Sequence, residues 1–255
     1  MSEARNRLRF ERRGGVTSLV ECRAELPLVV QRPLRGPDGQ AVVVLLTPAG
    51  ALFDGDDVHL RVECGAGTDV TLATAAATRL NRGQIGFELS VTVAAGGVFR
   101  YLPHELIPFR GARYRQRLML ALAAEARAAC LEVVTPGRTD EPFAYACLAF
   151  DTQVRVEDRL VVREAFVLGE DVQARLDPFS HYGSLLLLDG AGTSATAHAA
   201  SLAAWLSAQP VCAAASALPA AGVAVKMLGS SAQALRQTLL HAPGTPAWLP
   251  PLLPA

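Results

Sequence analysis

The chain has 255 residues, of which 51% are hydrophobic and 19% are charged, and its 24 basic residues balance 24 acidic ones. Such a composition is typical of a folded protein, and the length suits a single large domain over residues 1–255. A formal net charge of zero argues against nucleic acid as a partner, since binding to nucleic acid depends on neutralising phosphates.

The sequence offers no signal for secretion, membrane insertion or disulfide bonding. Residues 1–13 are strongly charged and lack the apolar segment of a secretory signal. Residues 190–225 contain no charged residue, yet polar residues and prolines interrupt them too often for a membrane-spanning helix. The five cysteines are scattered without a CxxC pair, which is typical of buried thiols in a reducing compartment. We therefore expect a cytoplasmic protein with no structural zinc and no membrane partner.

Alternation of apolar and polar residues predicts β-strands over the first two thirds of the chain. In residues 58–64 the even positions are apolar and the odd ones polar, as in a strand with one buried face. The alternation resumes after a turn at residues 65–68, and the whole pattern recurs 29 residues later from Leu89 and again from Leu118. Repeats of this kind bury their apolar face by stacking, which predicts a coiled β architecture. A β-sandwich with small-residue turns would show a similar period.

The remaining elements follow in chain order. Apolar alternation on both sides of Glu157 and Asp158 predicts a strand pair with a shorter turn. Residues 194–208 predict a helix, and Ser230-Ser231 predict the N-cap of a second helix over residues 232–241. Short strands are expected at residues 211–212 and 223–225, and an irregular proline-rich tail at residues 243–255. The expected fold is mainly β with two helices near the C-terminus.

One glycine motif raises the possibility of a nucleotide-binding enzyme. Residues Gly190 to Ala195 follow an apolar run and fit the pattern G-x-G-x-x-A of dinucleotide-binding proteins. However, the acidic residue that should bind the ribose about 20 residues later is missing, because no acidic residue follows Asp189. A glycine turn between a strand and a helix is the simpler interpretation, and the nucleotide-binding enzyme stays as an alternative.

No catalytic residues are predicted. The chain lacks the G-x-S-x-G motif of hydrolases, and His104-Glu105 is not followed by the second histidine of a zinc-protease helix. The five histidines are isolated in the sequence, which favours surface or hydrogen-bonded structural roles over metal ligation.

Two groups of acidic residues differ in character. Asp54 to Asp57 predict a solvated turn before the strand that starts at Val58. Glu132, by contrast, interrupts an apolar run, so its carboxylate either faces solvent by alternation, which base rates favour, or lies inside and needs a partner. A few oxygen atoms along an interior path would suit the transient passage of a divalent cation, because such sites bind weakly.

Several segments, read in order, resemble the urease accessory protein UreD family, called UreH in some species. The most specific is YLPHELIPFRGAR at residues 101–113, which is close to the family's YLPxExIPFxGA block. Residues 27–34, PLVVQRPL, resemble the N-terminal PLxxQRPL motif of the family, and Gly137-Arg138 and the helix at 228–240 also match. Residues 48–56 resemble the family's PPGG…GGD turn, with Ala51 and Asp54 in place of glycines. Residues 65–79 resemble its GA…T…A[ST]K strand pair, with Arg79 in place of lysine. The resemblance spans nearly the whole chain.

The resemblance implies a non-enzymatic protein that works in the cytoplasm with UreF and the nickel-carrying GTPase UreG to deliver nickel to apo-urease. It also implies a right-handed β-helix-like stack of strands with two helices, and a polar internal tunnel for transient nickel, with no tightly bound cofactor. The positions that match the tunnel lining are Asp56, Thr78 and Glu132, and more loosely Glu164. A third hypothesis is a β-solenoid interaction module unrelated to urease.

The neutral total charge hides an uneven distribution. All 24 acidic residues and 22 of the basic ones lie at or before Asp189, whereas the remaining 66 residues hold only Lys226 and Arg236. We expect the acidic first part to offer oxygen ligands and the nearly uncharged last part to be covered by a partner protein.

Overall fold

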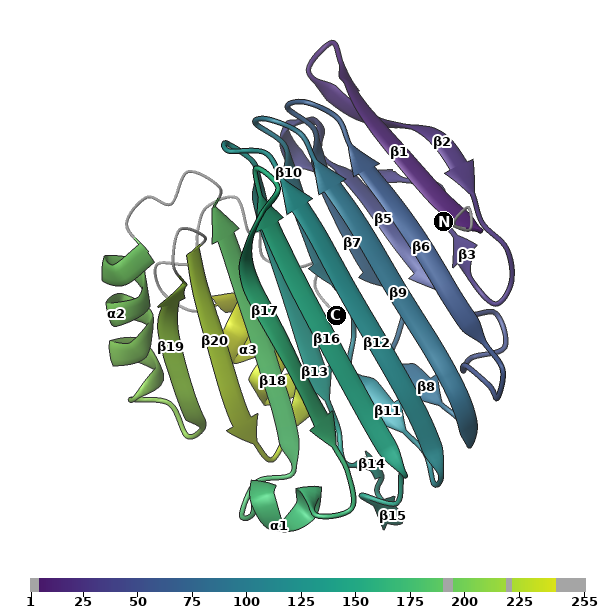
Figure 1. Ribbon diagram of the computed structural model, residues 1–255, viewed down its shortest axis with the longest axis vertical. Helices are drawn as coiled ribbons and strands as arrows, with labels where there is room; N and C mark the ends of the chain where they lie inside the picture. Colours follow the sequence, from purple (N-terminus) through teal and green to yellow (C-terminus); the bar gives the residue numbers. More distant parts are fainter. Residues whose placement is uncertain (1–4, 190–194, 219–221, 242–255) are drawn as a thin grey trace.

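The computed structural model describes residues 5–189, 195–218 and 222–241 (Figure 1). Strands make up 57% of the structure and form a β-solenoid of about 3 turns, accompanied by three helices. The predicted β-helix-like fold with two helices near the C-terminus is thus confirmed. The five-residue helix α1 (Val172–Leu176) was not expected. The predicted tail at 243–255 and residues 190–194 of the glycine motif lie outside the described residues.

Sheet A has seven strands in the order β17-β16-β12-β9-β6-β1-β2. From β1 to β16 neighbouring strands are parallel, whereas the pairs β1–β2 and β16–β17 at its two ends are antiparallel hairpins. The strands are β1 (Asn6–Arg13), β2 (Val16–Arg23), β6 (Asp57–Cys64), β9 (Gly83–Val93), β12 (Ala112–Leu122), β16 (Cys147–Val156) and β17 (Arg159–Leu168).

Sheet B follows the main path β19-β20-β18-β13-β10-β7-β5-β3, with the short strands β4, β8 and β11 beside it. Its strands are β3 (Val29–Val30), β4 (Leu34–Arg35), β5 (Ala41–Leu46), β7 (Asp69–Thr74), β8 (Thr78–Leu80), β10 (Val98–Leu102), β11 (Leu106–Pro108), β13 (Arg127–Val134), β18 (His181–Asp189), β19 (Cys212–Leu218) and β20 (Gly222–Gly229). Outside both sheets lie the pair β14 (Gly137–Arg138) and β15 (Glu141–Pro142), the 3-10 turn Pro37–Gly39, and the helices α2 (Ala195–Leu206) and α3 (Ala232–His241). None of the described helices is long and apolar enough to cross a membrane.

The 29-residue repeat is the physical coil of the solenoid. Leu60, Leu89 and Leu118 pair in one row across β6, β9 and β12 of sheet A. The row of Val70, Phe99 and Ala128 does the same across β7, β10 and β13 of sheet B. Each repeat therefore adds one strand to each sheet, as the stacking hypothesis predicted, and the parallel pairing excludes an ordinary antiparallel sandwich.

Two hydrophobic cores hold the layers together. The larger core fills the space between sheets A and B with the inward rows of both. The second core lies on the other face of sheet B, where Leu202 and Leu206 of α2 and Leu235 and Leu239 of α3 pack against β13, β18 and β20. Strands β13, β18 and β20 are consequently buried on both faces, which explains continuous apolar runs such as residues 185–188.

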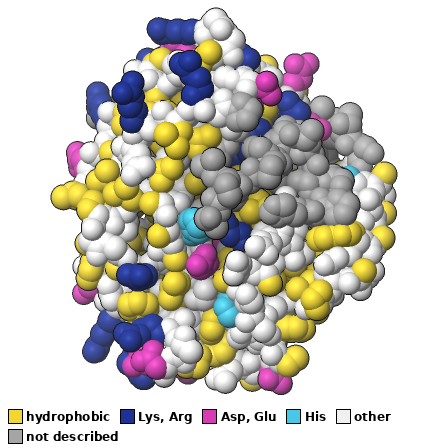
Figure 2. All heavy atoms as spheres, turned by 180° about the vertical axis from the view of Figure 1, so that it is seen from behind, with side chains coloured by type: hydrophobic (Ala, Val, Ile, Leu, Met, Phe, Trp, Pro, Cys, Tyr) yellow, Lys and Arg dark blue, Asp and Glu magenta, His cyan; other side chains and the backbone are white. Residues whose placement is uncertain are grey.

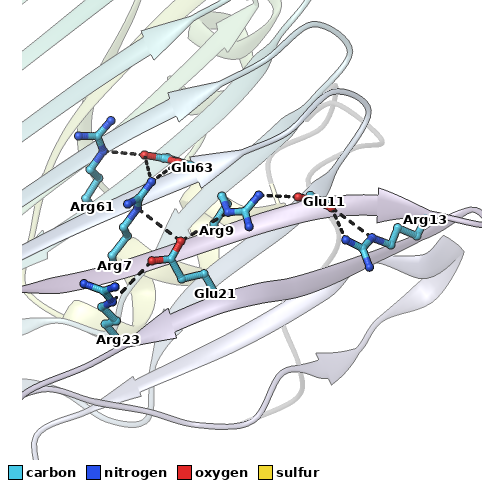
Figure 3. A network of polar contacts seen from close by, with 8 residues as sticks. All are labelled: Arg7, Arg9, Glu11, Arg13, Glu21, Arg23, Arg61 and Glu63. Carbon is cyan, nitrogen blue, oxygen red and sulfur yellow. Dashed lines mark hydrogen bonds and ion pairs between the residues drawn. The ribbon is translucent and has the colours of Figure 1, made fainter.

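The outer face of sheet A is a ladder of charges on β1, β2 and β6 (Figure 3). Glu63 lies between Arg7 and Arg61, at 3.0 and 2.8 Å, and Glu11 lies between Arg9 and Arg13, at 2.5 and 2.6 Å. Partial burial raises the pKa of Glu63, but the hydrogen bond and charge of Arg7, with the charge of Arg61, lower it by more. These residues are the polar phase of the sequence alternation, and pairs this exposed contribute little to stability individually.

Two local predictions are confirmed. The turn between β16 and β17 consists of Glu157 and Asp158 with φ of 47° and 60°, the left-handed geometry that suits a two-residue hairpin. Helix α3 starts at Ala232 as expected, and the Ser231 hydroxyl accepts a hydrogen bond from the N–H of Ala234 at 3.3 Å.

The nearly uncharged C-terminal part uses its apolar residues largely within its own fold. Seen from behind, hydrophobic and uncharged polar side chains predominate over α2 and α3 (Figure 2). Yet the large hydrophobic side chains that are exposed in the described part of the chain, Leu26, Leu34, Phe53, Leu160 and Val167, all come before residue 190. The low charge of residues 195–218 and 222–241 is therefore explained mainly by the second hydrophobic core.

The strand before the glycine motif is arranged unlike that of a dinucleotide-binding fold. Strand β18 is antiparallel to both of its neighbours, β13 and β20. The helix that follows β18 leads to β19, which runs in the same direction as β18 but is separated from it by the antiparallel strand β20. A dinucleotide-binding unit is instead built from parallel strands within a mostly parallel sheet. The local topology thus argues against the alternative of a nucleotide-binding enzyme.

Shortening a stacked core side chain tests the solenoid. Leu89 is fully buried in the central strand β9, so Leu89→Ala is expected to lower the free energy of unfolding by about 2–5 kcal/mol through lost burial and a residual cavity. The exposed Thr92 lies on the other face of the same strand, and Thr92→Ala should change the free energy of unfolding by less than about 0.5 kcal/mol. Urea unfolding followed by circular dichroism measures both, and equal effects would contradict the assigned register.

Candidate functional site

A cavity of about 230 Å³ lies between the two sheets. Its rim includes the exposed residues Gly50, Ala76 and Arg79, and its lining includes the buried residues Tyr114 and Gln116, together with Glu132. Most of the remaining wall is aliphatic or aromatic, including Leu28, Leu45, Leu52, Val58, Phe87, Tyr101 and Leu106. The cavity therefore leads from surface loops into the solenoid core, where it meets a small number of polar groups.

Glu132 points into the solenoid. It lies on β13 in the same phase as Cys130 and Val134, which belong to the core between the sheets, whereas Leu131 and Val133 face the helices. The solvent-facing position that base rates favoured is therefore wrong, and the observed position is the interior one with a partner. The partner is Gln116 of β12, whose amide donates a hydrogen bond to the carboxylate.

The Glu132 carboxylate is held in place by groups of both sheets. The Gln116 side chain in turn accepts a hydrogen bond from the Tyr114 hydroxyl at 3.0 Å. Burial raises the pKa of Glu132 to about 7; the charge of Lys226 and the Gln116 hydrogen bond oppose this, and the charge of Glu164 adds to it. Near neutral pH the carboxyl group is therefore poised between its charged and neutral forms.

Lys226 of β20 forms a second polar cluster next to Glu132. Its ammonium donates hydrogen bonds to Glu164 Oε2 at 2.5 Å, to Ser184 Oγ at 2.9 Å and to the Tyr182 hydroxyl at 3.0 Å. Ser184 pairs with Glu132 on one side and with Lys226 on the other, so the three residues occupy one row of sheet B. Glu164 reaches the ammonium from β17 of the facing sheet.

The two clusters form one continuous feature, which we call the polar seam. It starts at the cavity and ends at the side of the molecule where sheet A stops at β17 while sheet B continues with β20 and β19 (Figure 1). At that end the Lys226 and Glu164 side chains are 33% and 30% exposed, so the seam reaches solvent. Its members are Tyr114, Gln116, Glu132, Ser184, Tyr182, Lys226 and Glu164.

The structure brings together only some of the residues matched to the tunnel lining. Thr78 and Glu132 line the same cavity; Thr78 is in register with Val134, two strand spacings or about 10 Å away along the stack, and Glu132 lies two residues before Val134 on β13. Asp56 does not line it: its carboxylate accepts a hydrogen bond from the N–H of Phe53 at 2.7 Å and closes the surface turn before β6. Glu164 lies at the other end of the seam, against Lys226.

Sequence reasoning missed Gln116 and Lys226 as members of this site. A signal was present for each, because Gln116 falls in the apolar phase of β12 and Lys226 is the only lysine, in a segment otherwise nearly free of charge. What the sequence could not show is that these two residues, 110 positions apart, lie on either side of Glu132.

The polar seam offers oxygen atoms from carboxylates, hydroxyls and one amide. Oxygen donors suit hard and borderline divalent cations, and isolated ones bind them weakly. Within residues 5–189, 195–218 and 222–241, no three His, Cys, Asp or Glu side chains converge as a ligand set for a resident metal ion.

The chain is similar to known proteins over most of its length. Residues 2–248 match the family described as UreD urease accessory protein. The chain is 35% identical over 153 residues to the urease accessory protein UreD of Deinococcus radiodurans, covering 58% of this chain and 55% of that protein. It is 32% identical over 199 residues to the urease accessory protein UreD of an Anaeromyxobacter species, covering 74% of this chain and 66% of that protein. The aligned parts thus span about half to two thirds of these relatives.

Removing the Glu132 carboxyl group should change the pH dependence of stability. Its pKa is higher in the folded state, about 7, than the ordinary value of 4.5, so its contribution to stability is present below about pH 4.5 and lost as the pH rises through 7. Relative to Glu132→Gln, the wild type should lose up to about 3 kcal/mol of unfolding free energy between about pH 4.5 and pH 8. Urea unfolding across this range measures the difference, and parallel pH profiles would contradict the buried position.

Proposed function

Because the chain belongs to the UreD family of urease accessory proteins, we propose that it serves as a scaffold and metal-transfer chaperone in the maturation of urease. In this proposal it binds apo-urease together with UreF and UreG in the cytoplasm and helps to deliver nickel to the urease active site. It catalyses no reaction, and nickel is a transient cargo that it does not retain as a cofactor.

One observation supports the nickel path above all others. A cavity open at the surface ends at the inward-pointing, half-buried carboxylate of Glu132, and polar side chains continue from there to the partly exposed pair of Lys226 and Glu164. Burying such a row of polar groups is costly in a core that could be filled with apolar side chains, so a role in conducting a charged cargo accounts for it. Family membership also argues against an interaction module unrelated to urease.

The partner surface is proposed on the side of α2 and α3. Only two charged residues, Lys226 and Arg236, follow Asp189, and Lys226 is turned into the polar seam. A surface poor in charge can be covered by another protein without a large desolvation cost, which supports this side as the one that meets a partner.

The proposal as a whole is tested in cells that express urease with and without this chain. Co-purification with UreF and apo-urease, and a loss of urease nickel content after deletion, are the expected results. Full nickel loading of urease without this chain would falsify the proposal.

Variants of the path separate transfer from assembly. Asp56→Ala combined with Glu132→Ala is expected to lower the nickel content of urease several-fold while the accessory complex still assembles, because the interior oxygen ligands are lost and the surface is retained. Since Asp56 lies in a surface turn, Glu132→Ala alone should account for most of the loss. Metal analysis of purified urease and pull-down of the complex are the two measurements.

Glu88→Gln is the matched control, because Glu88 lies on the outer face of sheet A and pairs there with Arg117. It should leave nickel content unchanged. If the double variant fails to assemble, Asp56 and Glu132 are structural residues and the path through the cavity is unsupported.

A further inference from the structure

We propose that Lys226 is a tethered counter-ion that occupies a cation position in the polar seam and thereby keeps metal ions from being trapped between Glu132 and Glu164. The inference rests on the proposed function in one respect, because it assigns a role to Lys226 within the same cation path. It also makes a statement about the isolated protein that can be tested without urease.

The surroundings of the Lys226 ammonium resemble those of a bound cation. Three oxygen atoms converge on Nζ at 2.5 to 3.0 Å, one from the carboxylate of Glu164 and two from the hydroxyls of Ser184 and Tyr182. An ammonium group has three N–H donors, so all of them are used. Carboxylate and hydroxyl oxygens are also ligands for divalent cations, and here the lysine takes their place.

The position of Lys226 along the seam is decisive. Glu132 lines the cavity, and Glu164 lies at the partly exposed end beside β17. The ammonium lies between them, since it donates hydrogen bonds to Glu164 and to Ser184, and Ser184 is the strand neighbour of Glu132. A cation that reached Glu132 from the cavity would therefore meet a fixed positive charge before it could bind both carboxylates.

The choice of lysine over arginine fits this role. The chain has 24 basic residues and only this one is a lysine. An ammonium is a compact point charge that can be surrounded from three directions, whereas the planar guanidinium of arginine requires a wider, flat arrangement of acceptors. The flexible side chain of lysine can also withdraw without moving the strand that carries it.

Without the ammonium, the same atoms would form a strong metal site. Two carboxylates and two hydroxyls would then remain in a partly buried environment with no positive charge to balance them. Such a site would favour a divalent cation, and a protein that passes its cargo on must avoid holding it. Lys226 therefore limits the affinity of the path.

The alternative is that Lys226 only stabilises the fold through an ion pair. Both roles predict that its removal destabilises the protein, so a loss of stability does not distinguish them. They differ in cation affinity, because a purely structural lysine leaves no new metal site behind.

The experiment titrates the purified chain with Ni²⁺ and follows binding by isothermal titration calorimetry. Lys226→Gln is expected to bind Ni²⁺ at least about tenfold more tightly than the wild type, because a repelling unit charge at the site is gone. Ni²⁺ should also raise the melting temperature of the variant more than that of the wild type. The triple variant Lys226→Gln, Glu132→Gln, Glu164→Gln should not show this increase in Ni²⁺ affinity.

Arg163→Gln is the matched control, because this exposed cation on β17 lies outside the polar seam and its loss changes the net charge by the same amount. It should bind Ni²⁺ as the wild type does. Equal affinities of Lys226→Gln and the wild type would overturn the inference, as would a gain that persists in the triple variant.

If Lys226→Gln does not fold by itself, refolding is carried out with and without Ni²⁺. Recovery of folded protein only with the cation supports the inference, and failure in both conditions overturns it. A result in cells in which deletion of the chain leaves urease fully loaded would contradict the proposed function. The calorimetric result would still decide whether Lys226 excludes metal ions.

Discussion

The structure depends on the in-register stacking of parallel strands at intervals of 29 residues. Each inward side chain lies directly beside its counterpart one coil earlier and one coil later, so rows of mainly apolar side chains run through the interior. No single coil could bury its inner face without its neighbours, and the core therefore exists only as a property of the stack. The charged ladder on the outer face of sheet A follows from the same alternation, because every inward residue leaves its neighbours in solvent.

The polar seam interrupts these apolar interior rows. In sheet A, Gln116 falls in a row otherwise made of Val58, Phe87 and Phe150, and it meets Glu132 from the opposite sheet. A buried carboxylate without partners would be strongly destabilising, but Gln116, together with the nearby charge of Lys226, compensates it. The free-energy cost of placing these polar groups in the interior is offset because each group has a partner. The arrangement also places negative charge where a cation could bind.

The C-terminal part completes the fold from the other side of sheet B. The two helices cover strands that are already buried on their inner face, and this explains why residues 195–218 and 222–241 are so poor in charge. Strands β19 and β20 extend sheet B past the end of sheet A, which leaves one end of the seam open to solvent. The helices that cover sheet B and the solvent-exposed end of the polar seam thus both follow from sheet B extending beyond sheet A.

The sequence by itself determined the strand periodicity, the 29-residue coil, the hairpin at Glu157 and the start of α3, because these depend on contacts between near neighbours or on an exact repeat. It also identified Glu132 as an anomaly, although not its direction. The solvated turn at Asp54 to Asp57 was also predicted, and the Asp56 carboxylate does close it. Only the tertiary structure decided that Thr78 shares a cavity with Glu132, and that Gln116 and Lys226 lie on either side of Glu132. These relations join strands that are far apart in the chain, and no local sequence pattern shows which side chains the stacked coils bring face to face.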